Sequence, residues 1–260
     1  MNIKKHIPNA LTCCNLLCGC IGTLFTFYWR LDIAFYLVLI AAVFDFFDGF
    51  AARLLKVSSP IGKDLDSLAD MVTFGVLPGF IMSKMITFSL LFGSSENLTN
   101  GVISFSAGFN SLSTPLSFNI SFIAFLIPVF SALRLAKFNN DTRQTDSFIG
   151  VNTPANTLLI SSLGYILFKI PNLNISLNFI FNIYTLSALT IIMSFLLVSE
   201  LPIFALKFKN FGWTDNKIRY LFLTIALILL ILFQFFAFPF IILLYILLSV
   251  INNIITKTKN

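Results

Sequence analysis

The chain has 260 residues, of which 57% are hydrophobic and only 11% are charged, and its mean hydropathy is +0.91. A water-soluble domain carries about 25% charged residues, so this composition excludes a soluble globular protein of this size. The formal net charge of +6 does not indicate nucleic-acid binding, because no soluble basic face exists to carry it, and we attribute the charge to membrane topology and anionic lipid.

The apolar stretches are long and continuous, which favours transmembrane helices over the alternating strands of a membrane barrel. Each is close to the ~20 residues that a helix needs to cross a bilayer. The predicted spans cover residues 8–28, 32–55, 64–88, 116–138, 154–171, 175–198, 217–234 and 236–253. Because the last two are joined by a very short connection, a re-entrant pair is an alternative there. The sequence therefore predicts an all-α, polytopic transmembrane helical bundle of about eight spans, forming a single domain over residues 1–260.

Lysine and arginine are unevenly distributed between the two sides of this predicted bundle. With the N-terminus in the cytoplasm, 14 of the 17 basic residues fall on the cytoplasmic side. The three on the outer side are Arg30, Lys84 and Lys169. This asymmetry is the positive-inside signature of a multi-pass membrane protein. It predicts an integral protein of the cell membrane, if the chain is bacterial, with the connection after the second span facing the cytoplasm.

Five of the chain's 11 acidic residues lie within 26 residues, at Asp45, Asp48, Asp64, Asp66 and Asp70. Asp45 and Asp48 are three apart, and Asp66 and Asp70 are four apart, so each pair shares one face of a helix. Unpaired carboxylates are costly among apolar residues, and these segments contain too few basic residues to balance four anions. Two facing helices would present four carboxylates to one point, where oxygen ligands suit a hard divalent cation such as Mg²⁺, Mn²⁺ or Ca²⁺.

Small residues accompany these aspartates on both helices. Gly49 and Gly62 would let a bulky polar ligand approach the backbone, and Ala52 extends the same small patch. Asp48-Gly49 is commonly a turn signal, but the apolar run continues on both sides, so we place it within a helix. A Ser-Ser-Pro sequence ends that helix, and Pro60 suits the first position of the next one.

Together these residues form the pattern Asp45-x2-Asp48-Gly49-x2-Ala52-Arg53-x8-Gly62-x3-Asp66-x3-Asp70. The pattern resembles, at every fixed position, the signature of the CDP-alcohol phosphatidyltransferases. The resemblance implies a helical membrane bundle with a cytoplasm-facing polar active site, where the four aspartates hold two divalent metal ions. These ions grip the pyrophosphate of a CDP-linked lipid, and an alcohol displaces CMP. The resemblance makes Asp70 and Asp66 the expected catalytic residues, with Asp70 as the base, and it also suggests a homodimer.

Neighbouring residues resemble those of the phosphatidylserine synthases within this family. Residues 66–76 are similar throughout, and Ser67 stands where relatives that use glycerol phosphates usually carry Pro. Residues 8–16 and 132–139 are similar to the first-helix and fourth-helix segments of these synthases, whereas residues 150–156 are more polar than expected. The resemblance implies CDP-diacylglycerol and L-serine as substrates, with phosphatidylserine and CMP as products.

The candidate CDP-lipid-binding residues are Asn9, Thr12, Gly49, Ala52, Arg53 and Gly62. Asn9 and Thr12 could hydrogen-bond the cytosine ring, or they could cap the first helix. Arg53 could pair a phosphate bidentately, or it could anchor the helix at the membrane surface. Arg134, near the inner end of the fourth span, is the candidate for binding the serine carboxylate, with a helix-end anchor as the alternative.

Two alternative functions stay open from the sequence. Glycerol 3-phosphate or inositol phosphate could be the acceptor in the same reaction class, but each would need extra basic residues at the pocket. A membrane cation transporter could use the aspartates as an ion path. A transporter should show inverted repeats and broken helices in matching halves, whereas the acidic residues here are confined to one end.

Overall fold

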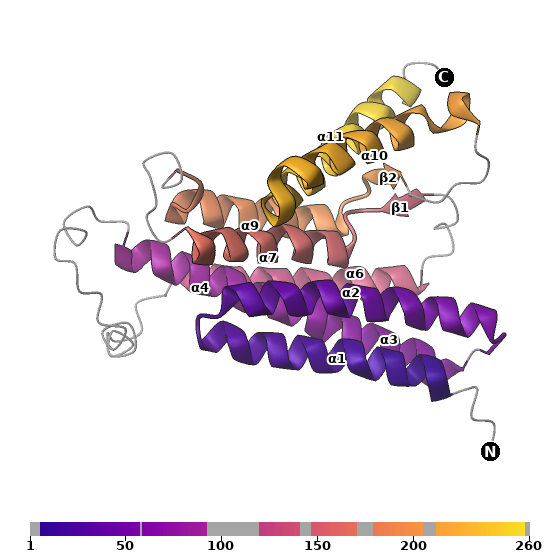
Figure 1. Ribbon diagram of the computed structural model, residues 1–260, viewed down its shortest axis with the longest axis horizontal. Coiled ribbons are helices and arrows are strands. Elements are labelled where there is room, and N and C mark those ends of the chain that lie inside the picture. The colour runs from indigo at the N-terminus through magenta and orange to yellow at the C-terminus, as the bar shows by residue number, and fades with distance from the viewer. Residues whose placement is uncertain are drawn as a thin grey trace.

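The computed structural model describes residues 6–57, 59–92, 120–140, 147–170, 179–204 and 212–257, and within these ranges nearly all of the chain is helical (Figure 1). The first half contains α1 (His6–Phe27), α2 (Leu31–Leu54), α3 (Pro60–Met71), the π-helical turn η2 (Val72–Val76) and α4 (Leu77–Phe92). The second half contains η5 (Ile120–Phe125), α6 (Leu126–Asn140), α7 (Thr153–Lys169), α9 (Ile183–Val198), α10 (Trp213–Phe233), η6 (Gln234–Ala237) and α11 (Phe238–Lys257). The predicted all-α class is confirmed.

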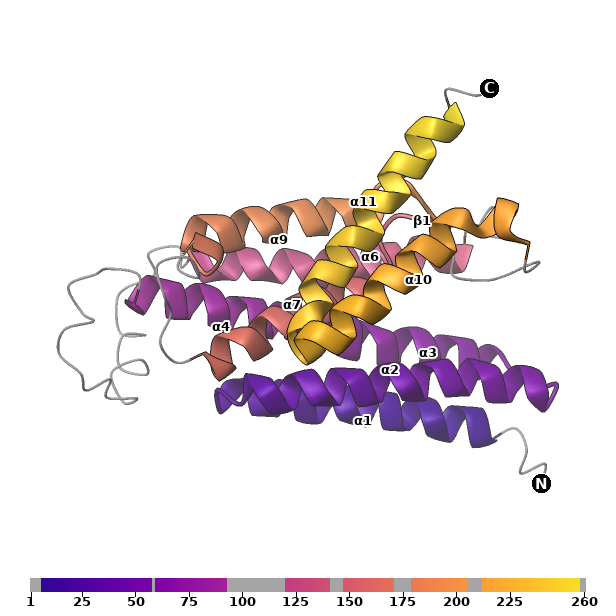
Figure 2. The same cartoon turned by 45° about the horizontal axis from the view of Figure 1, so that its top comes forward.

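Five helical segments are long and apolar enough to cross a membrane. They are His6–Phe27, Leu31–Leu54, Pro60–Leu90, Ile120–Asn140 and Asn216–Ile254. The last of these covers most of α10 and α11, which lie side by side as a hairpin that leans away from the other helices (Figures 1 and 2). With 17 and 16 residues, α7 and α9 are shorter than a typical span. A helix therefore lies within every predicted span, while the count of eight membrane crossings stays a prediction.

Local sequence signals explain most helix boundaries. α2 continues through Asp48-Gly49 to Leu54, as predicted, and α3 begins at Pro60, where the Ser59 hydroxyl accepts a hydrogen bond from the Gly62 amide at 3.0 Å. The predicted start of the sixth span, at residue 175, lies outside the described residues, and within them α9 begins at Ile183. Asn182 caps this helix by accepting a hydrogen bond from the backbone amide of the second helical residue. Residues 93–119 and 171–178, where several predicted boundaries fall, lie outside the described residues.

A short two-stranded ribbon was not predicted from the sequence. β1 (Ser147–Ile149) pairs antiparallel with β2 (Pro202–Phe204). Gly150 follows β1 with a φ of +76°, and its amide donates to the Leu201 carbonyl at 2.9 Å. A side chain there would also meet the Leu197 carbonyl, which a Cβ atom would approach to 2.6 Å. The ribbon therefore ties the connection before α7 to the connection after α9.

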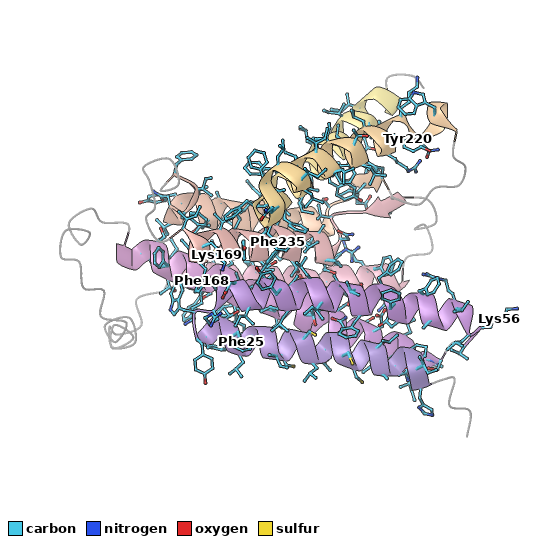
Figure 3. The ribbon with its side chains drawn as sticks, viewed as in Figure 1. Phe25, Lys56, Phe168, Lys169, Tyr220 and Phe235 are labelled. Atoms are coloured by element: carbon cyan, nitrogen blue, oxygen red, sulfur yellow. The ribbon has the colours of Figure 1, made fainter. Side chains whose placement is uncertain are left out.

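The bundle has two apolar cores that share α7 and α9. One core joins α2, α4, α6, α7 and α9 around buried residues that include Val38, Ile81, Ile127, Ile160 and Leu186. The other lies under the α10–α11 hairpin and includes Leu159, Met193, Phe222 and Ile241. Phe235, in the turn of that hairpin, packs its ring against Phe35, Tyr36 and Tyr165 (Figure 3). The hairpin therefore packs on the bundle through its turn and through the side of the hairpin that carries Phe222 and Ile241.

Charged groups separate to the two ends of the bundle. We call the end where α2 ends and α3 begins the aspartate end. Lys56 lies there, while Lys169 lies toward the opposite end (Figure 3). At that opposite end the Arg30 guanidinium is 5.7 Å from the Phe168 ring centre, and the Lys84 ammonium is 5.6 Å from the Trp29 ring centre. The three basic residues predicted to lie outside thus gather at one end.

The π-helical turn η2 joins α3 to α4 and begins two residues after Asp70. The Thr73 hydroxyl, within this turn, donates to the Asn15 carbonyl of α1 at 3.0 Å. The Thr157 hydroxyl of α7 donates to the Phe74 carbonyl at 2.9 Å. α1 also approaches closely at Gly19, where a Cβ atom would lie 2.9 Å from the Thr73 Cα atom. Contacts from α1 and α7 therefore fix the backbone of η2.

Candidate active site

Three carboxylates from two helices converge at the aspartate end. Asp45 and Asp48 project from the last three turns of α2, and Asp66 projects from the middle of α3. One oxygen from each lies within 4.8 Å of the others. Asp48 is buried and the other two are partly buried, so their negative charges are incompletely solvated. The spacing predicted from sequence therefore brings the two helix faces together.

Asp70 lies one turn deeper along α3, beside this cluster. Its carboxyl group approaches that of Asp45 and accepts a hydrogen bond from the Asn15 amide at 3.1 Å. Asn15 is fully buried in α1, and its backbone carbonyl accepts the hydrogen bond from Thr73. Asn15 thus orients Asp70, a role that the sequence analysis missed. An amide in the middle of an apolar helix, facing the aspartate-bearing helices, was the available signal.

A cavity of about 270 Å³ opens beside the aspartates. Its wall is formed by Pro8, Asn9, Thr12, Asp48, Gly49, Ala52, Val57, Ser59, Gly62, Lys63 and Asp66. Five of the six candidate CDP-lipid-binding residues line this cavity. The sixth, Arg53, does not line it and is exposed. The Thr12 hydroxyl donates to Asp48 at 2.7 Å, which couples the cavity wall to the carboxylate cluster.

The two glycines of the cavity wall have different surroundings. A Cβ atom built on Gly49 would meet nothing within 4 Å, so the backbone there borders open space. A Cβ atom on Gly62 would lie 3.0 Å from the Ser59 hydroxyl and 3.1 Å from the Asn9 side-chain oxygen. Gly49 therefore leaves room for a ligand, whereas Gly62 also permits close packing of α1 against the start of α3.

α6 contributes a buried arginine near Asp70. Arg134 is only 7% exposed, its guanidinium lies 5.4 Å from the Phe138 ring centre, and Asp70 is the acid that acts on it electrostatically. Its Nε atom has no hydrogen-bond partner among the described residues. The Lys63 ammonium and Asn139 carbonyl, 3.2 Å apart, join α3 to α6 nearby. Arg134 thus faces the interior and not the membrane surface.

The carboxylate cluster fits a hard divalent cation. All its donors are oxygens, which Mg²⁺, Mn²⁺ and Ca²⁺ prefer. Within the described part of the chain, no ion pair joins any of the four aspartates to a lysine or arginine. Partly buried carboxylates this close repel one another unless cations or protons neutralise them. The donor chemistry therefore supports a metal centre formed by Asp45, Asp48 and Asp66.

Comparison with known proteins places these residues in a wider group. The sequence profile described as "CDP-alcohol phosphatidyltransferase" matches residues 5–170. Three similar proteins are each named CDP-diacylglycerol--serine O-phosphatidyltransferase. The Bacillus subtilis protein is 29% identical over 150 residues, covering 58% of this chain and 70% of the relative. The Helicobacter pylori protein (strain J99) is 30% identical over 155 residues, covering 59% and 54%, and the Saccharomyces cerevisiae protein is 29% identical over 141 residues, covering 51% and 41%.

Proposed function

Since the chain belongs to the CDP-alcohol phosphatidyltransferase family, we propose that it transfers the phosphatidyl group of CDP-diacylglycerol to L-serine, releasing CMP. The observation that carries this proposal is the cluster of Asp45, Asp48 and Asp66 at the edge of a cavity. The relatives named above support serine as the acceptor, and the matched regions span 41% to 70% of their lengths. Family membership also disfavours the cation-transporter interpretation.

The cavity is the proposed site for the CDP head of the lipid donor. Asn9 and Thr12 lie on its α1 wall, where they could hydrogen-bond the cytosine ring. Asp48 and Asp66 lie at its other side, so a pyrophosphate within the cavity would be next to the carboxylates. Gly49 and Ala52 keep the wall between them free of bulk. Arg53, which is exposed, would reach the donor only at the mouth of the cavity.

Two divalent cations, Mg²⁺ or Mn²⁺ or else Ca²⁺, are the proposed cofactors. Asp45, Asp48 and Asp66 would hold them, with Asp70 as the fourth ligand. Bound cations would neutralise the pyrophosphate and stabilise the charge that develops on the attacking and leaving oxygens.

The side chains around Asp70 suit attack by a hydroxyl group. In the proposed reaction the serine oxygen forms a bond to the phosphorus that carries diacylglycerol, and the bond from that phosphorus to the CMP oxygen breaks. Asp70 would accept the hydroxyl proton, and Asn15 would hold its carboxylate in position through the 3.1 Å hydrogen bond. Asp66, which lines the cavity, would act on the phosphate groups of the lipid donor in the same reaction.

Arg134 is the proposed site for the serine carboxylate. Its buried guanidinium can bind a carboxylate through two parallel hydrogen bonds. A single arginine is enough for a zwitterionic amino acid. A dianionic phosphate, as in glycerol 3-phosphate, would require more positive charge than Arg134 alone supplies beside Asp70. The acceptor side of the site therefore favours serine.

The proposal includes a membrane placement and an assembly. The aspartate end would face the cytoplasm, because most basic residues of the sequence are predicted on that side. The chain would be a single integral-membrane domain of the cell membrane in a bacterium. A homodimer is proposed from the family resemblance alone.

The test is a transfer assay with the purified protein in detergent micelles. CDP-diacylglycerol, Mg²⁺ or Mn²⁺ and a panel of labelled alcohols would be supplied, and CMP and the lipid product would be measured. We expect phosphatidylserine formation to exceed transfer to glycerol 3-phosphate or inositol phosphate. A stronger reaction with a phosphorylated alcohol would overturn the serine assignment while leaving the reaction class intact.

A further inference from the structure

The first turn of α7 contains two buried side chains with unsatisfied polar atoms. Thr153 and Asn156 are both 0% exposed. Neither the Thr153 hydroxyl nor either amide atom of Asn156 has a hydrogen-bond partner among the described residues. Leaving a buried polar group unpaired is unfavourable, and a carboxamide has both donors and an acceptor to satisfy. A bound ligand would remove this cost.

The packing of α7 places this turn level with Asp70. The Thr157 hydroxyl contacts the Phe74 carbonyl, and a Cβ atom on Gly164 would lie 2.9 Å from the Ile81 side chain. The two contacts are seven residues apart both on α7 and on the segment formed by η2 and α4. These two segments therefore run parallel with a constant register. Thr153, one turn before Thr157, therefore lies level with Asp70, one turn before Phe74.

α6 brings Arg134 to the same level from another direction. Ser131 faces η2, since its Cβ atom would lie 3.1 Å from a Cβ atom on Gly75. Arg134 is three residues farther toward the aspartate end on the same helix face, and it interacts electrostatically with Asp70. The Ser131 hydroxyl and the Arg134 Nε atom are also buried and unpartnered among the described residues.

The two helix faces point into one interior. Ile127, on the face of α6 that carries Ser131 and Arg134, belongs to the same apolar core as Ile160, which is four residues after Asn156 on α7. Beyond this core, toward the aspartates, both faces change from apolar to polar. The unsatisfied atoms of α6 and α7 therefore lie at the end of this shared core that is level with Asp70.

Resting on the proposed function, we infer that Asn156 and Thr153 recognise the ammonium group of the amino-acid acceptor. An ammonium group has three donors and no acceptor, so it pairs with the Asn156 amide oxygen and the Thr153 hydroxyl oxygen. Arg134 then takes the carboxylate of the same molecule. A neutral amide serves here better than another carboxylate, which would compete for the cations that Asp70 and its neighbours attract. The polar first turn of α7 thus selects a zwitterion over a neutral or phosphorylated alcohol.

The test compares acceptors that differ by one charged group. Initial rates would be measured with serine and with glycerate, which keeps the hydroxyl and carboxylate but lacks the ammonium group. Asn156→Leu preserves volume and removes the amide. Because a hydrogen bond to a charged group contributes about 1.5–3 kcal/mol, we expect the KM for serine to rise about 10- to 100-fold. The KM for glycerate and the KM for CDP-diacylglycerol should change by less than about twofold, since neither molecule carries an ammonium group.

Ser161→Ala provides the matched control. Ser161 is equally buried and unpartnered among the described residues, but it lies farther from Asp70 and about 140° around α7 from Asn156. Ser161→Ala should leave the KM for serine and the KM for glycerate unchanged. An equal rise for serine and glycerate in Asn156→Leu, or no rise for serine, would overturn the inference. If Asn156→Leu does not fold, Thr153→Val replaces it as the test variant. The KM for serine should then rise while the KM for glycerate does not. An unchanged KM for serine in Thr153→Val would contradict the inference. If the wild-type protein prefers another class of alcohol, the proposed function itself fails.

Discussion

Replacing Asp48 by asparagine should separate the stability of the protein from its activity. Asp48 has two carboxylate neighbours within 4.8 Å. At that separation, and at an effective dielectric constant of about 20, each pair of unit charges repels by about 3.5 kcal/mol. The substitution keeps the shape of the side chain and leaves an oxygen that can still accept the hydrogen bond from Thr12. It removes one anion from the cluster.

Two opposite effects follow from the loss of this charge. Without metal, repulsion in the cluster falls, so the unfolding midpoint measured in chelator should rise above that of the wild type. With metal and both substrates, the rate of CMP release should fall about 100- to 1,000-fold, the scale of a lost electrostatic stabiliser in an active site. The metal concentration for half-maximal activity should also rise, because one ligand charge is missing.

Asp64→Asn is the matched control for this experiment. Asp64 lies on α3, between the cavity residues Lys63 and Asp66, but its side chain is exposed and outside the carboxylate cluster. Its replacement should leave CMP release within about twofold of wild type, since exposed charges contribute little. An equal loss of activity in both variants, or turnover of Asp48→Asn within about tenfold of wild type, would refute the assignment of Asp48 as a metal ligand.

Four further predictions concern the same site. Excess chelator should abolish CMP release, and adding Mg²⁺ or Mn²⁺ should restore it; full turnover in chelator would exclude the metal centre. Gly49→Leu should raise the KM for CDP-diacylglycerol about tenfold or more, with the half-saturating metal concentration unchanged, because its side chain would fill open cavity space. Gly62→Leu should in addition lower the unfolding midpoint, since a Cβ atom there already crowds Ser59 and Asn9; a wild-type midpoint would contradict that packing. Arg134→Lys keeps the charge but loses the planar fork, so it should raise the KM for serine about tenfold and that for the donor far less. Equal changes in both constants would count against Arg134 as the carboxylate site.

The carboxylate cluster could be predicted from sequence because its information is local. Asp45 and Asp48 lie on one uninterrupted helix, Asp66 and Asp70 lie on the next, and only a short connection separates the two helices. Helical spacing then determines which side chains meet.

Features that depend on distant contacts could not be predicted in this way. The β1–β2 ribbon pairs segments of only three residues that are more than fifty residues apart, too short to show an alternating pattern. The role of Asn15 depends on how closely α1 approaches η2, which Gly19 permits but does not specify.

The π-helical turn η2 lets α3 and α4, which form one continuous helical segment, differ in rotation about their common axis. Each residue added to a helix rotates everything after it by about 100°, so the wide turn at residues 72–76 offsets α4 from α3 by roughly one residue's rotation. Deleting a single residue from this turn would return the segment to regular α-helix and swing Asp66 and Asp70 away from Asp45 if α4 kept its position in the core. The turn therefore uncouples two requirements: the apolar face of α4 can vary to suit its packing while the carboxylates of α3 keep their aim.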